Sequence, residues 1–273
     1  MSQAWLLTQT FRFEGQAVAH DVFGSGPPVV LVHGTPFSSY VWRSVARELA
    51  RTHRVFVHDL IGYGQSEKRE GQDVSLGVQN RLLAALLGHW GLERPDVIAH
   101  DFGGATALRA HLLDGADYRK LLLIDPVALR PWGSPFVRHV RQFEAAFAGI
   151  PDYIQDAILR AYLQNAAHEP LRDEALNGYI APWMGETGRP AFYRQIAQMD
   201  QRYTDEVQDL YGRMRCPCRL LWGVEDQWIP VERGRELARL LPGCVLTEIA
   251  GCGHLMQEDA PEAIVSAALS FFA

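Results

Sequence analysis

The residues best suited to covalent chemistry lie at positions 97–104, where an apolar run leads into an acidic residue and two glycines. The run Val97-Ile98-Ala99 is typical of a buried strand, and residues 105–113 have the pattern of a helix, so the chain must reverse direction around Asp101. A side chain at such a turn is exposed above the sheet edge, beside the free N–H groups of the following helix. This pattern predicts an elbow that presents Asp101 as a nucleophile.

An N-terminal helix cap is the alternative role for Asp101, because Asp is a common capping residue. Two other polar residues favour the nucleophile. Asp226 follows the apolar strand predicted at residues 218–222, and His254 follows the last predicted strand, at residues 245–249. Polar residues that follow parallel strands meet at one edge of the sheet. We therefore predict a triad of Asp101, Asp226 and His254, in the chain order of α/β-hydrolases.

Three other residues near this edge have alternative interpretations. Asp125 ends the strand at residues 120–125 and competes with Asp226 as the acid of the triad, but an Asp before proline is also an ordinary turn residue. We expect Asp226 to hold the histidine. His33 and His100 flank the predicted site, and we expect each to bond neighbouring backbone rather than to act as a base.

The elements that position these residues alternate between strand and helix. A hairpin at residues 11–23 is followed by strands at 29–32 and 54–58 and helices at 40–50 and 76–90. Such alternation predicts an α/β fold with a mostly parallel sheet covered by helices. From 127 to 212 the chain is helical, aromatic-rich and interrupted by prolines. We therefore divide it into a core, residues 1–126 and 213–273, and a helical cap, residues 127–212.

Composition limits the possible partners. The chain has 273 residues, of which 48% are hydrophobic and 21% charged, and its net charge of −6 argues against a nucleic-acid partner. It has no apolar run long enough for a membrane span and no signal peptide, which predicts a cytoplasmic protein with no membrane partner. No cluster of His, Asp or Cys has metal-ligand spacing, so we predict neither a metal nor a cofactor.

The sequence resembles α/β-hydrolases of the haloalkane dehalogenase and epoxide hydrolase group. Besides the elbow, the similarity is carried by residues 33–43 (HGTPFSSYVWR) and 59–66 (DLIGYGQS). The resemblance implies an eight-stranded sheet with an inserted helical cap. It also implies that Asp101 forms an ester with an electrophilic carbon, that His254 activates water to hydrolyse the ester, and that Asp226 orients His254. Backbone N–H groups of Thr35 and Phe102 would hold the oxyanion.

Two positions depart from the dehalogenase pattern. That family commonly has Asn and Trp where this chain has Thr35 and Phe102, and Phe has no donor for a departing halide. A dehalogenase therefore needs donors from the cap, and the candidates are Trp183, together with Trp132, His139 and His168.

Epoxide hydrolysis is the alternative chemistry, because it needs a cap tyrosine to protonate the ring oxygen instead of a halide donor. Residues 191–195 resemble the cap segment that carries one such tyrosine, which makes Tyr193 the candidate, with Tyr153 as the second. A ligand-binding protein that retains the fold without turnover is a further alternative. Dehalogenase-like hydrolysis of a small or medium apolar electrophile, by a monomer or homodimer using water as co-substrate, is the leading prediction.

Overall fold

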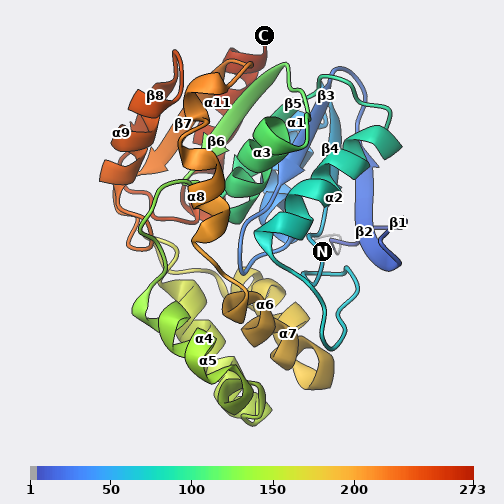
Figure 1. Cartoon of the computed structure of the whole chain (residues 1–273), viewed down its shortest axis with the longest axis vertical. Coiled ribbons are helices and arrows are strands. Elements are labelled where there is room, and N and C mark those ends of the chain that lie inside the picture. Colours follow the sequence, from blue (N-terminus) through green and yellow to red (C-terminus); the bar gives the residue numbers. More distant parts are fainter. Residues whose placement is uncertain (1–4) are drawn as a thin grey trace.

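The computed structural model describes residues 5–273, and its centre is an eight-stranded sheet (Figure 1). The strand order is β1-β2-β4-β3-β5-β6-β7-β8; β2 is antiparallel to β1 and β4, and all the other neighbours are parallel. The strands are β1 (Gln9–Phe13), β2 (Gln16–Phe23), β3 (Pro28–Val32), β4 (Arg54–His58), β5 (Asp96–His100), β6 (Lys120–Ile124), β7 (Cys218–Gly223) and β8 (Val245–Ile249). The predicted α/β-hydrolase fold is confirmed.

The central strands are apolar because helices cover both faces of the sheet. Every residue of β5 is buried, and β3, β4 and β6 each expose part of only their first residue. Continuous apolar runs of this kind mark parallel strands, whose crossover helices cover both faces. The covering helices are α1 (Arg43–Leu49), α2 (Leu76–His89), α3 (Phe102–Leu113), α9 (Val231–Leu240) and α11 (Pro261–Phe272); α10 (Met256–Asp259) precedes α11.

Within the described residues, the chain between β6 and β7 contains helices and no strand. They are α4 (Pro135–Ala148), α5 (Asp152–Gln164), α6 (Asp173–Ile180), η2 (Ala181–Trp183), α7 (Gly185–Ala197), α8 (Arg202–Gln208) and η3 (Tyr211–Arg213). Figure 1 shows α4 to α7 gathered beyond one end of the sheet, whereas α8 lies against the core. The assignment of residues 127–212 as a separate cap domain stays a prediction.

Strand register brings the polar residues after the strands to one edge. Ala99 in β5 pairs with Val32 in β3 and Leu123 in β6, and Ile124 pairs with Leu221 in β7. These parallel strands therefore end at the same level. The segments after β3, β5, β6 and β7 meet at the end of the sheet that faces α4 to α7 (Figure 1).

None of the helices formed by residues 5–273 has the length and apolar character to cross a bilayer.

Candidate active site

Asp101 lies at the tight turn between β5 and α3. Its backbone has φ 52° and ψ −119°, a conformation that non-glycine residues rarely adopt, and its side chain caps no helix N–H group. The capping alternative is therefore wrong. The turn also needs glycine beside it, since a Cβ on Gly103 would lie 2.3 Å from the carbonyl oxygen of Val32. This is the predicted elbow, and it exposes the carboxylate above the sheet edge.

The carboxylate of Asp101 lies between a backbone donor and an imidazole. Its Oδ1 accepts a hydrogen bond from the N–H of Thr35 at 2.7 Å, and its Oδ2 is 3.4 Å from Nε2 of His254. The N–H of Phe102, at the start of α3, has no hydrogen-bond partner among residues 5–273. Of the two predicted oxyanion donors, Thr35 thus bonds the Asp101 carboxylate and Phe102 is the next residue in the chain.

Asp226 holds His254 from the other side. Its Oδ2 accepts from Nδ1 of His254 at 2.8 Å, and its Oδ1 accepts from the N–H groups of Trp228 at 2.7 Å and Ile229 at 2.9 Å. This arrangement places the Nδ1 proton toward Asp226 and leaves Nε2 facing Asp101. The structure brings the three predicted residues together in the geometry of a nucleophile, a base and an orienting acid.

His254 is fully buried between two carboxylates. Burial alone lowers the pKa of His254, but the charge of Asp226 and the contacts with Asp101 and Asp226 outweigh it and raise the pKa well above its ordinary value. The two neighbouring carboxylates therefore favour the imidazolium form of His254.

Asp125 is close to this group but cannot orient His254. Its Oδ1 accepts from the N–H of Gly223 at 2.9 Å, and its Oδ2 is buried without a hydrogen-bond partner in the described chain. Burial, and then the charge of Asp226, raise the pKa of Asp125 well above its ordinary value. Asp125 lies at the end of β6, and the contact with His254 belongs to Asp226.

The two flanking histidines bond backbone. Nδ1 of His33 donates to the carbonyl of Gly34 at 2.9 Å, and its Nε2 accepts from the N–H of Leu60 at 2.9 Å. Nε2 of His100 donates to the carbonyl of His254 at 2.9 Å, and burial lowers the pKa of His100 to about 3. Both rings bond backbone groups, as the sequence predicts.

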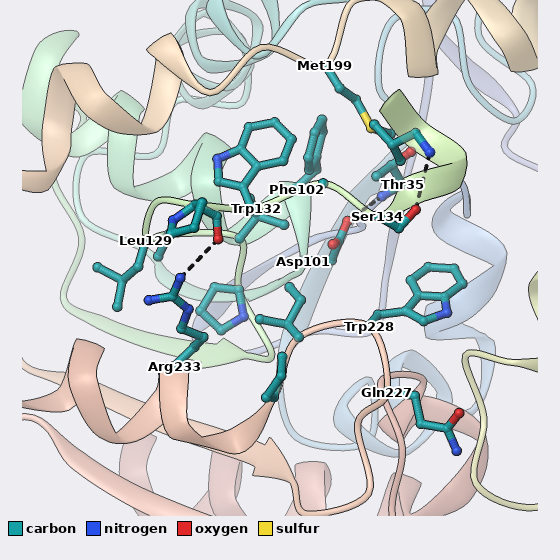
Figure 2. A pocket seen from close by; sticks show the side chains of 18 of the residues that line it. Thr35, Asp101, Phe102, Leu129, Trp132, Ser134, Met199, Gln227, Trp228 and Arg233 are labelled. Atoms are coloured by element: carbon teal, nitrogen blue, oxygen red, sulfur yellow. Dashed lines mark hydrogen bonds between the residues drawn. The ribbon is translucent and has the colours of Figure 1, made fainter. Parts of the chain in front are cut away.

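A cavity of about 420 Å³ opens onto Asp101 (Figure 2). Most of its lining is apolar or aromatic and comes from the segment after β6, the segment after β7, and helices α4 and α5. In Figure 2, Phe102, Trp132 and Trp228 lie around the carboxylate of Asp101. Such a lining suits an apolar small molecule whose reactive carbon reaches Asp101.

The cap donors predicted for a halide are engaged elsewhere or lie outside this cavity. The indole N–H of Trp183 donates to the carbonyl of Pro36 at 2.7 Å, and that of Trp132 donates to Oγ1 of Thr204 at 2.8 Å. His139 and His168 do not line the cavity. The hydroxyl of Thr35 donates to Oε1 of Gln195 at 2.6 Å, so it too is occupied.

The two predicted cap tyrosines are also outside the cavity. Tyr153 is 74% exposed, and the fully buried Tyr193 donates its hydroxyl to Oε1 of Gln155 at 2.6 Å. The structure therefore places neither residue in the lining of the cavity beside Asp101.

A different tyrosine of the same helix as Tyr153 lines the cavity. Tyr162 stacks on Trp228 at a centroid distance of 4.8 Å, and Trp228 stacks on His254 at 5.0 Å. The hydroxyl of Tyr162 has no hydrogen-bond partner in residues 5–273. Burial, and then the charge of Asp101, raise the pKa of Tyr162, which keeps the phenol protonated.

Helical periodicity is the sequence signal that identifies Tyr162. Residues nine apart on an α-helix lie on opposite faces, since each residue advances the helix by about 100°. Tyr153 and Tyr162 are therefore opposed, and the buried residues Gln155, Leu159 and Leu163 place Tyr162 on the inward side.

No group of three or more His, Cys, Asp or Glu side chains within residues 5–273 has an arrangement that would hold a metal ion.

Comparison with known proteins agrees with this fold. The sequence matches the alpha/beta hydrolase family over residues 29–267. It is 28% identical over 255 residues to a 2-hydroxy-6-oxo-2,4-heptadienoate hydrolase of Pseudomonas putida, covering 87% of this chain and 86% of that protein. It is 25% identical over 262 residues to haloalkane dehalogenase 2 of Mycobacterium tuberculosis, covering 91% and 89%.

One solved structure is much more similar. An alpha/beta hydrolase fold protein from Burkholderia ambifaria superposes with a TM-score of 0.95 and 53% sequence identity, over 98% of this chain and 99% of that one. The chain belongs to the alpha/beta hydrolase family.

Proposed function

We propose that this protein hydrolyses an apolar electrophile through a covalent ester on Asp101. The observation that carries the proposal is the placement of the Asp101 carboxylate at the elbow, between the Thr35 N–H and Nε2 of a His254 that Asp226 orients. A carboxylate is already ionised at neutral pH and needs no base before it attacks carbon.

An epoxide is the electrophile that the cavity supports best. It needs a proton donor for the ring oxygen, and the free, protonated hydroxyl of Tyr162 lines the cavity. In the first step an oxygen of Asp101 bonds to a ring carbon, the carbon–oxygen bond breaks, and Tyr162 gives its proton to the departing oxygen.

The second step releases the product. Once the ester has formed, Asp101 carries no charge, so His254 gives its extra proton to water and the Tyr162 phenolate regains a proton from water. Neutral His254 then takes a proton from water, whose oxygen attacks the ester carbonyl, and the oxyanion is held by the N–H groups of Thr35 and Phe102. Collapse of this intermediate returns the proton to the departing alkoxide, so one epoxide and one water give a diol and the free enzyme.

A haloalkane is the second candidate electrophile. It is supported by the similarity to a haloalkane dehalogenase and by the resemblance of residues 33–43 to that family. The engaged indole N–H groups of Trp132 and Trp183 weigh against it, since a departing halide needs free donors.

The test is to trap the ester. We expect the His254→Gln variant, incubated with a panel of terminal epoxides and haloalkanes, to gain mass on the peptide that contains Asp101, because hydrolysis is blocked. A gain equal to the whole epoxide identifies ring opening, and a gain equal to the alkyl group without halogen identifies dehalogenation. The double variant His254→Gln, Asp101→Asn is the control and should gain no mass. A folded His254→Gln protein that gains no mass with any reagent contradicts the proposal.

Tyr162→Phe separates the two chemistries. We expect it to slow epoxide ring opening by about 10²- to 10⁴-fold, because general acids contribute that much, and to leave attack on an alkyl bromide nearly unchanged. Single-turnover ester formation followed by mass spectrometry measures both reactions. Tyr193→Phe is the matched control, since its hydroxyl is bonded to Gln155 outside the cavity. Equal effects of the two substitutions would exclude Tyr162 as the acid.

A further inference from the structure

The cavity has one charged side chain of each sign among its described lining residues. Asp101 is the carboxylate, and Arg233, in the first turns of α9, is the cation. Figure 2 shows the two set apart, with Arg233 on the side of the cavity where Leu129 lies. The rest of the lining is mostly apolar and includes Val127, Leu129 and Ile229.

The guanidinium of Arg233 has N–H donors that its contacts within the protein do not use. Its Nη2 donates to the carbonyl of Pro131 at 3.0 Å, and its Nη1 is 2.9 Å from Oε2 of Glu236. A guanidinium has five N–H donors, so these two contacts leave three. The Glu236 side chain is 46% exposed, so water screens its attraction to Arg233. Glu236 therefore neutralises the charge of Arg233 only in part. The side chain of Arg233 is 25% exposed and is held in place at the cavity by Pro131.

We propose that the substrate is an amphipathic electrophile: an apolar chain with the reactive carbon at one end and a carboxylate at the other, which Arg233 binds. This inference rests on the proposed function of Asp101 and adds the substrate class. A carboxylate pairs well with a guanidinium, whereas the negative charge of Asp101 repels it. The two charges therefore orient the substrate, with its carboxylate away from Asp101 and its electrophilic carbon toward it.

The kinetic test uses a series of ω-epoxy carboxylates of increasing chain length and the neutral ω-epoxy carboxamide of each length. We expect kcat/KM for the carboxylate to pass through a maximum at the length that spans the cavity, and to exceed that of its carboxamide by about tenfold there, mainly through KM. Arg233→Gln should abolish this preference, because Gln keeps a donor for Pro131 without the charge. Arg233→Lys should keep part of it.

Two neighbouring variants sharpen the result. Glu236→Gln should increase the preference for the carboxylate, because it removes the anion that competes for Arg233. Arg235→Gln is the control and should not change it, since Arg235 pairs with Glu248 and does not line the cavity. A carboxylate preference that survives Arg233→Gln, or none in the native enzyme, overturns the inference while leaving the covalent chemistry intact.

A binding measurement separates this inference from the proposed reaction. The quenching of tryptophan fluorescence, with Trp132 and Trp228 in the cavity wall, reports binding of saturated alkanoates and of primary alcohols of the same length. We expect the alkanoate to bind about tenfold more tightly, and Arg233→Gln to equalise the two, even if no epoxide is turned over. Equal binding of both ligands to the native protein contradicts the proposal.

Discussion

At the scale of single residues, the protonation of His254 is linked to the charge of Asp101. The imidazole lies 3.4 Å from Asp101 and 2.8 Å from Asp226, and the two carboxylates favour its charged form. In the proposed reaction, formation of an ester on Asp101 removes one of these charges. The first step of that reaction would therefore generate the base that the second step needs.

The link between the charge of Asp101 and the protonation of His254 predicts that the rate of ester hydrolysis depends on pH. The ester is hydrolysed only when His254 is neutral, so the rate of its hydrolysis should rise with pH, through an apparent pKa lower than that of His254 in the free enzyme. Asp101→Asn imitates the neutral ester and should lower the pKa of His254, which NMR titration of labelled histidine measures directly. An unchanged pKa in Asp101→Asn would show that Asp101 does not control the imidazole.

The identity of the orienting acid gives a second prediction. We expect Asp226→Asn to slow ester hydrolysis by about 10³- to 10⁴-fold, because the wrong tautomer of His254 is then favoured. The ester should accumulate and be visible by mass spectrometry. Asp125→Asn is the matched control at the neighbouring strand end and should retain most of the rate, since it keeps the acceptor for Gly223. The reverse pattern would assign the acid to Asp125.

At the scale of elements, α7 contacts the turn that supplies the oxyanion donor. Oε1 of Gln195, on α7, accepts from the Thr35 hydroxyl at 2.6 Å and from the Tyr63 hydroxyl at 3.0 Å. The Thr35 backbone donates to Asp101 at the same time. Gln195 therefore acts as a positioning residue for the segment after β3.

Gln195→Leu should release that segment. We expect kcat to fall by about tenfold with little change in KM, because removal of a whole oxyanion donor costs 10²–10³ and this change only loosens one. Gln198→Leu, at the end of the same helix, is the control; Gln198 bonds the backbone of Gln72 and Val74, and neither residue lines the cavity. A fall in KM alone, or equal losses in both variants, would contradict a role in positioning Thr35.

At the scale of the whole molecule, the site imposes a cost on stability. Folding buries Asp125 beside Asp226 and raises the pKa of Asp125. A carboxyl whose pKa is raised on folding destabilises the native state above the pKa of the unfolded chain, about 3.9, and has no such effect below it.

Asp125→Asn should therefore stabilise the protein at neutral pH, because the amide is neutral without binding a proton, and the gain should grow by about 1.4 kcal/mol per pH unit above about 4. Thermal unfolding followed by circular dichroism at several pH values tests this. The melting temperature of the variant should exceed that of the native protein at pH 7, and the difference should shrink as the pH falls through about 4. A variant that is less stable at pH 7 would show that the Asp125 carboxyl makes a needed contact.

The sequence by itself determined the sheet, the tight turn at Asp101 and the meeting of Asp101, Asp226 and His254. Apolar runs specify buried strands, and their alternation with helices predicts that the strands are parallel. The carboxyl ends of parallel strands lie at one edge of the sheet, so Asp101, Asp226 and His254 meet there. The sequence also predicts the tight turn, because any side chain at Gly103 or Gly104 would clash with the atoms packed against them.

Only the tertiary structure decided which side chains of the helical segment reach that edge. Tyr153 is exposed, and Tyr193 and Trp183 are hydrogen-bonded to groups outside the cavity, whereas Tyr162 of α5 lines it. Arg233, which lines the cavity from α9, comes from outside the helical segment. The physical reason is that a helix presents its residues in all directions. Its sequence gives the period of the buried face, but the partner against which that face packs is set by contacts between distant segments.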